Sequence, residues 1–152
     1  MKVIVTLDER NGMMFNHRRQ SRDRVLLEHM AGLTQGARLL MNRYSAAQFS
    51  RGLPENAEVR EDFLTAAGAG DYCFVEDAAL SAFASSVTEL YVYRWNRLYP
   101  ADQRLDLKTD GWTTTLVDEF AGSSHPRISL YRCTRPARAE NEVNLTEGEV
   151  SL

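Results

Sequence analysis

The segment at residues 71–95, DYCFVEDAALSAFASSVTELYVYRW, constrains the fold of this chain more than any other. It opens with a short run at 72–75 whose aromatic and β-branched residues are typical of a strand buried on both faces. Apolar residues then recur at helical spacing across 79–87, which predicts a helix lying on a sheet, and a second strand is expected at 90–93. A strand, a helix and a strand without a hairpin signal predict a right-handed crossover in a parallel sheet.

Two carboxylates follow the first strand of this crossover. Ligands of parallel sheets bind beyond the carboxyl ends of the strands, so Glu76 and Asp77 are candidate site residues. One interpretation is that Asp77 caps the expected helix and Glu76 is solvated. The alternative is an acid–base pair in which burial raises one pKa.

Strand and helix patterns alternate along the rest of the chain. Strands are expected at 2–8, 37–41, 111–117 and 127–134, and helices at 25–33, 45–49 and 59–67. The first strand is compact and β-branched, which favours a central place in the sheet. The last two strands have no helix between them, so they should pair antiparallel at the sheet edge. The chain is therefore predicted to be α/β, with a mixed, mostly parallel central sheet, flanking helices and a C-terminal antiparallel strand pair.

The length of 152 residues indicates one domain, expected over residues 1–135. Hydrophobic residues at 43% and charged residues at 26% are ordinary for a soluble globular protein. No apolar run approaches the roughly 18 residues that a membrane span needs, and no secretory leader pattern is present. We expect a cytoplasmic protein without a membrane partner.

Residues 136–152 form an acidic tail. One arginine and four glutamates in it account for the whole formal net charge of −3. The tail lacks aromatic residues and a sustained period, so we expect it to be disordered. An acidic tail that folds back over a basic patch is the alternative interpretation.

The cysteines and histidines do not indicate metal or nucleophile chemistry. Cys73 and Cys133 lie in apolar strands without CxxC spacing, so both are expected to be reduced core residues. His17, His29 and His125 are isolated from one another, so no metal site is expected. The Ser-Ser-His sequence that ends at His125 is interpreted as a polar loop.

Residues 16–24, NHRRQSRDR, form the densest basic cluster of the chain. Four arginines accompany a single carboxylate, Asp23, which can also cap the helix that follows. A solvated loop is one interpretation. The alternative is an anion site for a phosphorylated ligand or a nucleic acid, because guanidinium groups bind phosphate bidentately.

Two further segments have no regular pattern. The segment at 13–15 is expected to be a mobile apolar stretch, and the segment at 94–107 is expected to be an irregular connection.

The turn after the second strand, Asn42-Arg43-Tyr44-Ser45, is a further candidate anion site. Ser45 is a suitable cap for the expected short helix. A strand, a polar turn and a helix start point free backbone N–H groups at a ligand, and a phosphate suits that geometry.

These segments, in this order, resemble the dihydrofolate reductase superfamily. VTLDERNGMMFN at 5–16 resembles the family's first strand, an Asp, a spacer and the glycine that begins the flexible substrate loop. The resemblance implies substrate contacts at Gly12, Phe15 and Arg19. It also makes Asp23 the counterpart of the acidic residue that holds the pterin, and so the candidate catalytic residue.

Two further strings carry the resemblance to the cofactor site. LLMNRYSAAQF at 39–49 resembles the family's strand and Gly-Arg-x-Thr turn, whose Arg and hydroxyl grip the 2′-phosphate of the cofactor. The segment at 71–95 resembles the strand, helix and strand around the family's paired glycines. The resemblance spans most of residues 1–134 and implies cofactor contacts at Asn42, Arg43, Ser45, Glu76 and Asp77.

The chain departs from the family at the paired glycines, which let the backbone approach the NADPH pyrophosphate. Glu76 and Asp77 in their place would repel that group by roughly several kcal/mol in a partly desolvated site. The family's Leu-Pro-Trp segment is replaced by Arg18-Arg19-Gln20, and the chain looks one strand short between Phe49 and Glu58. We therefore expect a diverged, shortened member whose NADPH site is degraded.

Three functions remain as alternatives. The first is a domain that binds a small, potentially phosphorylated ligand in a cleft at the carboxyl ends of the strands, beside Asp23, Arg43 and Glu76. The second is a working NADPH-dependent reductase of a pterin-like or other small substrate. The third is an anion or nucleic-acid binding module that uses the cluster from Arg18 to Arg24, which the near-neutral body of the chain disfavours. The oligomeric state is left open.

Overall fold

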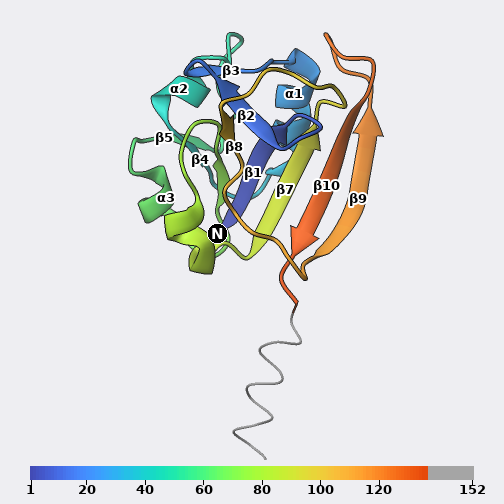
Figure 1. The fold of residues 1–152 in the computed structure, drawn as a ribbon. Coiled ribbons are helices and arrows are strands. Elements are labelled where there is room, and N and C mark those ends of the chain that lie inside the picture. The colour runs from blue at the N-terminus through green and yellow to red at the C-terminus, as the bar shows by residue number, and fades with distance from the viewer. Residues whose placement is uncertain (137–152) are drawn as a thin grey trace, which may run out of the picture.

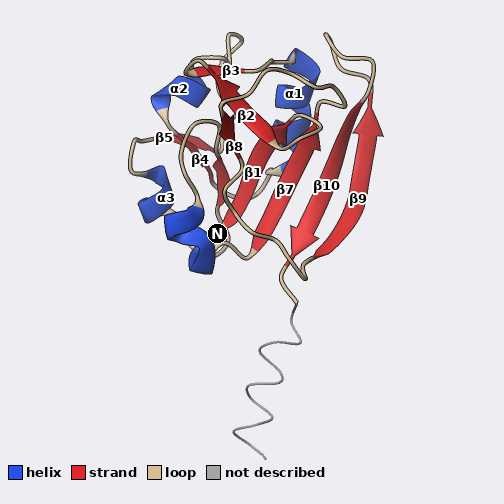
Figure 2. Cartoon of the chain, viewed as in Figure 1, coloured by secondary structure: helices blue, strands red, loops and turns tan. Residues whose placement is uncertain are grey.

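A seven-stranded sheet forms the centre of the computed structural model, which describes residues 1–136 (Figures 1 and 2). Its strands are β1 Lys2–Leu7, β4 Leu39–Met41, β5 Ala57–Val59, β6 Tyr72–Phe74, β7 Glu89–Arg94, β9 Thr113–Phe120 and β10 Ile128–Thr134. The order is β5-β4-β6-β1-β7-β10-β9, and neighbours from β5 to β7 are parallel. β10 runs antiparallel to both β7 and β9, which confirms the predicted fold class.

The other elements surround this sheet. The helices are α1 Arg24–Leu33, α2 Arg43–Ala46, α3 Phe63–Ala66 and the 3-10 helix η1 Ser81–Ser86, and a small sheet of order β3-β2-β8 combines β2 Gly12–Phe15, β3 Arg18–Arg19 and β8 Gln103–Arg104. None of the helices among the described residues is long and apolar enough to cross a membrane. The predicted acidic tail lies outside the described residues apart from Pro136, so its disorder stays a prediction.

The first strand takes the central place that its sequence predicts. β1 pairs in parallel with β6 on one side and β7 on the other. Val3, Ile4 and Val5 are fully buried, because β1 is covered on both faces. Burial of side chains of this size contributes roughly 1.5–3 kcal/mol each relative to exposure.

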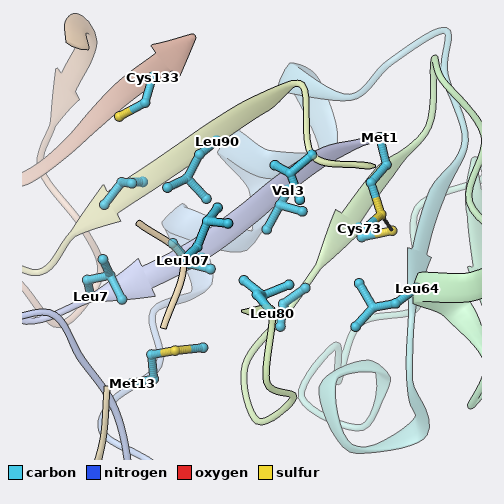
Figure 3. Packing of buried hydrophobic residues seen from close by; sticks show 14 of the residues in the cluster. Met1, Val3, Leu7, Met13, Leu64, Cys73, Leu80, Leu90, Leu107 and Cys133 are labelled. Atoms are coloured by element: carbon cyan, nitrogen blue, oxygen red, sulfur yellow. Dashed lines mark hydrogen bonds between the residues drawn. The ribbon is translucent and has the colours of Figure 1, made fainter. Parts of the chain in front are cut away.

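The core has two layers, one on each face of the sheet. Alternate residues of β1 enter different layers: Val3 and Leu7 pack on one face, whereas Ile4 packs on the other. Leu26 and Met30 of α1 cover the second face. Figure 3 shows the first layer, in which residues of β1, β6, β7 and the η1 region meet.

Both cysteines are free and buried within the first core layer, as predicted. The Cys73 thiol lies 3.7 Å from the sulfur of Met1. Burial raises the pKa of Cys73 to about 12, so the thiol stays protonated and unreactive near neutral pH.

The crossover helix predicted at 79–87 is wrong in type. The structure has the short 3-10 helix η1 there, and its flanking residues Leu80 and Val87 are the fully buried ones. The Asp106 carboxylate accepts from the backbone N–H groups of Leu80 and Ser81 at 2.8 and 3.1 Å. The cap therefore comes from a distant segment rather than from Asp77, and that contact is invisible to helical periodicity.

The apolar stretch at 13–15 is a strand rather than a mobile segment. Met13 and Met14 of β2 are buried, and β2 pairs with β3 on one side and β8 on the other. Asn16 and His17 have φ of 56° and 61°, the left-handed backbone of a tight hairpin turn. The expected loops at 16–24 and 94–107 therefore each contribute a strand to the small sheet.

The segment between α2 and β6 also differs from expectation. The single helix predicted at 59–67 is divided into the end of β5 and the four-residue α3. The sequence suggested that a strand is missing between Phe49 and Glu58. The structure has the short strand β5 at the end of this stretch, where it pairs in parallel with β4. Asn42, rather than Ser45, caps α2, because the Asn42 Oδ1 accepts from the Ser45 N–H at 3.0 Å.

Candidate functional site

Two cavities open at the end of the sheet where the parallel strands have their carboxyl ends, the end at which Figure 1 shows α1, α2 and β3. β9 runs in the same direction as β7, because each is antiparallel to β10, so the segment after β9 reaches the same edge. We call the two cavities the basic cavity and the acidic cavity, by the charges that line them.

The basic cavity has a volume of about 450 Å³ and lies between α1 and residues 48–54. Its lining combines an apolar wall, three arginines, two carboxylates (Asp23 and Glu28), the Gln48 amide and several hydroxyls. The apolar members are Leu27, Ala31, Phe49, Leu53 and Pro54, the arginines are Arg22, Arg24 and Arg51, and the hydroxyls belong to Ser50, Ser123 and Ser124. This composition suits a small ligand that has both an apolar body and an anionic group.

The charges of the basic cavity are only partly compensated. Arg24 forms an exposed ion pair with Glu28 across one helical turn at 3.1 Å. Arg22 and Arg51 form no ion pair with any of the described residues. Two guanidinium groups are thus available to an anion at this cavity.

Asp23 lies at the inner end of the basic cavity, but its carboxylate is enclosed by the protein. Its side chain is fully buried. One oxygen accepts from the N–H groups of Val25, Leu26 and Ser123 at 3.0, 3.2 and 2.9 Å. The other accepts from the Ser124 N–H at 2.8 Å and from its hydroxyl at 3.1 Å. This carboxylate joins the N-terminus of α1 to the loop after β9.

The ionisation of Asp23 follows from these donors. Burial opposes the charged form, but hydrogen bonds from the Ser124, Ser123 and Leu26 N–H groups and from His125 outweigh burial and hold the pKa of Asp23 far below its usual range. At neutral pH the Asp23 carboxylate is therefore charged, and its hydrogen bonds link the start of α1 to the loop at Ser123 and Ser124. Adding a Cβ at Gly122 would place it 2.3 Å from the Asp23 Oδ2, so the glycine is required for this close approach.

His125 completes the buried polar cluster around Asp23. Its Nδ1 lies 3.0 Å from the Asp23 Oδ2, and because that carboxylate is ionised, Nδ1 carries the proton and donates it. Its Nε2 faces the Tyr99 hydroxyl at 2.9 Å and the Ser21 hydroxyl at 3.2 Å, and its ring stacks on Trp95. Sequence reasoning missed this role of His125, because its partners come from two distant segments, 21–23 and 95–99, and no local spacing indicates that contact.

The acidic cavity has a volume of about 310 Å³ and lies between α3 and the segment that follows β6. Glu61, Asp62 and Asp77 line it, together with the rings of Phe63 and Phe83, and no lysine or arginine does. Asp62 is paired with Arg60, but Asp77 and Glu61 form no ion pair with the described residues. A phosphate entering here would meet like charges.

The predicted phosphate-binding turn, Asn42 to Ser45, lies at this acidic cavity. Its hydrogen-bond donors are already bound to carboxylates of the protein. The Arg43 N–H donates to the Glu61 carboxylate at 2.9 Å. The Asn42 amide donates to Asp77 at 2.9 Å while its oxygen accepts from the Ser45 N–H. A carboxylate of the protein thus takes the backbone donor that the turn would offer to a phosphate.

Glu76 forms a buried ion pair with Arg19 between the two cavities. The Arg19 Nε and Nη2 donate to the two Glu76 oxygens at 3.0 and 3.1 Å, and the Glu76 side chain is 4% exposed. The Ser45 hydroxyl and the Gln48 amide also donate to Glu76, at 2.8 and 3.0 Å. Burial alone would lower the pKa of Arg19, but the Glu76 carboxylate raises it, so the guanidinium stays protonated.

The Arg19 side chain is held on its other side by Tyr44. Its guanidinium lies 4.3 Å from the Tyr44 ring centroid and donates to the Tyr44 carbonyl at 3.1 Å. The Arg19 backbone N–H donates to the Tyr44 hydroxyl at 2.7 Å. β3 therefore inserts a side chain between α2 and the carboxyl end of β6.

The remaining predicted substrate contacts lie apart from both cavities. Gly12 accommodates the network around Asp8, because a Cβ there would lie 2.5–2.7 Å from Gln20, Asp8 and Ala101. Phe15 is 44% exposed at the end of β2. The structure thus brings Arg19, Ser45 and Glu76 together, places Asn42, Arg43 and Asp77 beside them, and leaves Asp23, Gly12 and Phe15 elsewhere. No group of three or more metal-ligating side chains occurs within residues 1–136.

Comparison with known proteins bears on the fold. No family model and no curated protein matches the sequence. Among solved structures, the chain is similar to dihydrofolate reductase from Enterococcus faecalis complexed with NADP(H) and RAB-propyl, with a TM-score of 0.57 and 9% sequence identity. The match covers 89% of this chain and 96% of that chain. A likeness at this identity shows the fold alone, and the fold of this chain is dihydrofolate reductase-like.

Proposed function

We propose that this domain binds a small anionic ligand with an apolar body in the basic cavity and does not bind NADPH at the position where its fold relatives would. The observation that carries the proposal is the lining of the basic cavity, which combines an apolar wall with Arg22 and Arg51, two arginines that form no ion pair with the described residues. Charge-assisted hydrogen bonds from arginine to phosphate or carboxylate are among the strongest in proteins. A phosphorylated or carboxylated aromatic compound fits this combination.

The acidic cavity supports the second half of the proposal. Glu61 accepts the backbone donor of Arg43, and Asp77 lies beside it. Arg19 fills the space next to Glu76. A dinucleotide would have to displace these contacts and also overcome the repulsion between its phosphates and the acidic lining.

A working reductase is the less favoured alternative. The Asp23 carboxylate accepts six hydrogen bonds from the protein and is buried, so it has little capacity left for a substrate. The nucleic-acid alternative is also less favoured. Arg19 is turned inward to Glu76 and Arg24 is paired with Glu28, so the basic cluster does not form one continuous surface.

A binding titration followed by NMR tests the proposal. Phenyl phosphate, benzoate, inorganic phosphate, NADPH and dihydrofolate are titrated separately into the labelled protein, and the arginine side-chain N–H signals are recorded. We expect phenyl phosphate to shift the signals of Arg22 and Arg51, and to bind more tightly than inorganic phosphate because it also covers the apolar wall. At 100 times its dissociation constant it should add about 2.7 kcal/mol to the free energy of unfolding.

Matched variants assign the site. Arg51→Ala should weaken phenyl phosphate binding about tenfold, since one charge-assisted hydrogen bond contributes about 1.5–3 kcal/mol. Arg43→Ala, an exposed arginine beside the acidic cavity, should leave it unchanged. Tight NADPH binding that Arg43→Ala abolishes would instead support the reductase, and the absence of any response to the anionic aromatic probes at millimolar concentration would contradict the proposal.

A further inference from the structure

The polar lining of the basic cavity is exposed at some positions and buried at others. Arg22 and Arg51 are exposed, whereas Asp23 and Gln48 are the buried polar residues of the lining. Gln48 is 6% exposed, and its side-chain amide meets Glu76 just beyond the carboxyl end of β6. The arginines therefore lie at the mouth of the cavity, and Gln48 lies at its base.

Of the two buried groups, Gln48 has an unused hydrogen-bonding atom. Both Asp23 oxygens accept hydrogen bonds from N–H and hydroxyl groups of the protein. The Gln48 Nε2 donates to the Glu76 Oε1 at 3.0 Å, but the Gln48 Oε1 accepts no hydrogen bond from residues 1–136. Within those residues the one enclosed side-chain oxygen without a hydrogen bond is the Gln20 Oε1, so the Gln48 Oε1 is open to the cavity that Gln48 lines.

The orientation of the Gln48 amide is set by Glu76. A carboxylate in an ion pair offers acceptor atoms, so the NH2 group of the amide must face Glu76 and the oxygen must point away from it. The Ser45 hydroxyl donates to the same Glu76 oxygen at 2.8 Å, which holds that acceptor in place. Donation to a charged acceptor also polarises the amide and makes its oxygen a stronger acceptor. The base of the cavity thus presents an acceptor that a ligand can satisfy with a donor.

We infer that the ligand of the basic cavity carries a hydroxyl or N–H donor at the end opposite its anionic group, and that Gln48 selects for this donor. The anionic group lies at the mouth with Arg22 and Arg51, the apolar body covers the wall that includes Phe49, and the donor reaches the Gln48 Oε1. A ligand without the donor would bury this oxygen unsatisfied. The ligand class is therefore a hydroxyl- or amino-substituted aromatic phosphate or carboxylate. This inference rests on the proposed function, because it takes the basic cavity as the binding site.

Three aryl phosphates test the inference on the full chain by isothermal titration calorimetry. Phenyl phosphate has no second polar group, 4-hydroxyphenyl phosphate adds a donor, and 4-methoxyphenyl phosphate has an oxygen at the same position that cannot donate. We expect the hydroxyl compound to bind about fivefold more tightly than phenyl phosphate, the effect of one neutral hydrogen bond. The methoxy compound should gain nothing. In NMR spectra of the unchanged protein, the hydroxyl compound should shift the Gln48 side-chain amide signals more than phenyl phosphate does.

Two variants separate the base of the cavity from its mouth. Gln48→Met keeps the length of the side chain but removes the acceptor, so it should bind the hydroxyl compound and phenyl phosphate equally. This variant also loses the donor to Glu76, and the ratio of two affinities within one variant does not depend on how much of the protein is folded. Arg51→Ala is the matched control. It should weaken both compounds by the same factor and leave their ratio unchanged.

The outcomes distinguish this inference from the proposed function. Equal binding of the hydroxyl compound and phenyl phosphate to the unchanged protein would overturn the inference and leave the proposed function intact. A preference that persists in Gln48→Met would also overturn it, because another group would then recognise the hydroxyl, and so would Gln48 amide signals that the hydroxyl compound leaves unshifted. Failure of all three compounds to bind would contradict the proposed function itself, and the inference would fail with it.

Discussion

The basic and acidic cavities flank the same edge of one sheet, yet their charges are opposite. Within residues 1–136, Arg22 and Arg51 of the basic cavity form no ion pair, and neither do Glu61 and Asp77 of the acidic cavity. The carboxyl ends of parallel strands form a general binding position, but the fold does not specify the sign of charge there. Under the proposed function, the acidic cavity excludes anions and the basic cavity accepts them.

The two cavities are separated by the Arg19–Glu76 ion pair, which gives the largest expected effect. Arg19→Ala leaves the Glu76 charge buried without its partner, so we expect a loss of about 3 kcal/mol in the free energy of unfolding. Urea unfolding monitored by tryptophan fluorescence measures this loss. The control is Arg24→Ala in the exposed pair with Glu28, which should cost less than about 1 kcal/mol. Equal losses in the two variants would contradict the expectation that the buried Glu76 charge depends on Arg19.

Asp23→Asn should have the next largest effect, because it removes the charge that links the start of α1 to the loop after β9 beside the basic cavity. We expect about 2 kcal/mol of destabilisation at neutral pH, since several donors lose a charged acceptor. Weaker phenyl phosphate binding should accompany this change, and Arg22 and Ser124 signals should broaden in NMR spectra. An Asp23→Asn variant with unchanged stability would contradict the role of Asp23 in linking α1 to the loop after β9.

The pH dependence of stability follows from the same carboxylate. Its pKa is lowered in the folded state, so its contribution is fully present above the unfolded value of about 4 and is lost as pH falls below that value. Urea unfolding at neutral and acidic pH should therefore show a smaller acid-induced loss for Asp23→Asn than for the unchanged protein. A parallel loss in both proteins would assign the acid sensitivity to other carboxylates.

Removing negative charge from the acidic cavity tests whether its carboxylates repel a dinucleotide. Glu61→Gln with Asp77→Asn keeps acceptors for the Arg43 N–H and the Asn42 amide but removes two negative charges. We expect NADP binding to strengthen by about thirtyfold, because each of the two charges near an exposed phosphate costs about 1 kcal/mol. Isothermal titration calorimetry measures the change. Unchanged binding would mean that the Arg19 side chain, rather than the acidic lining, excludes the dinucleotide.

The smallest effect is expected in the basic cavity itself. Glu28→Gln releases Arg24 from its exposed ion pair and so adds a third available guanidinium. Phenyl phosphate should bind about threefold more tightly, in keeping with the small free energy of surface ion pairs. Glu55→Gln, an exposed change just beyond Pro54, is the matched control and should give no such increase. A weaker affinity in Glu28→Gln would mean that this glutamate contributes to the site rather than competing with it.

Elements with strong local patterns could be predicted from the sequence, and those that depend on distant partners could not. The β-branched run of β1, the strand pair β9–β10 and the Asp23 cap of α1 follow from period, composition and spacing. The 3-10 helix η1 could not be predicted, because its cap is Asp106. The hairpin between β2 and β3 was missed, because Asn16 and His17 are not the usual Asn-Gly pair at such a turn.

The candidate site shows the same division. The sequence drew attention to Glu76, Asp23 and the turn from Asn42 to Ser45, and all of them lie at the carboxyl edge of the sheet. It could not show that Arg19 neutralises Glu76 or that Glu61 accepts the Arg43 N–H. It placed His125 in a polar loop without indicating its contact with Asp23, and it did not indicate the wall formed by residues 48–54, which meets α1 only in the folded structure.

The sequence by itself determined a mixed α/β sheet, its central strand, its antiparallel end and the edge at which polar residues collect, because these depend on periodicities that each segment carries alone. Only the tertiary structure decided which of those polar residues are free and which are already paired. Hydrogen bonds and ion pairs are made between segments that lie tens of residues apart, and whether a charge is available to a ligand depends on the partner that folding places beside it.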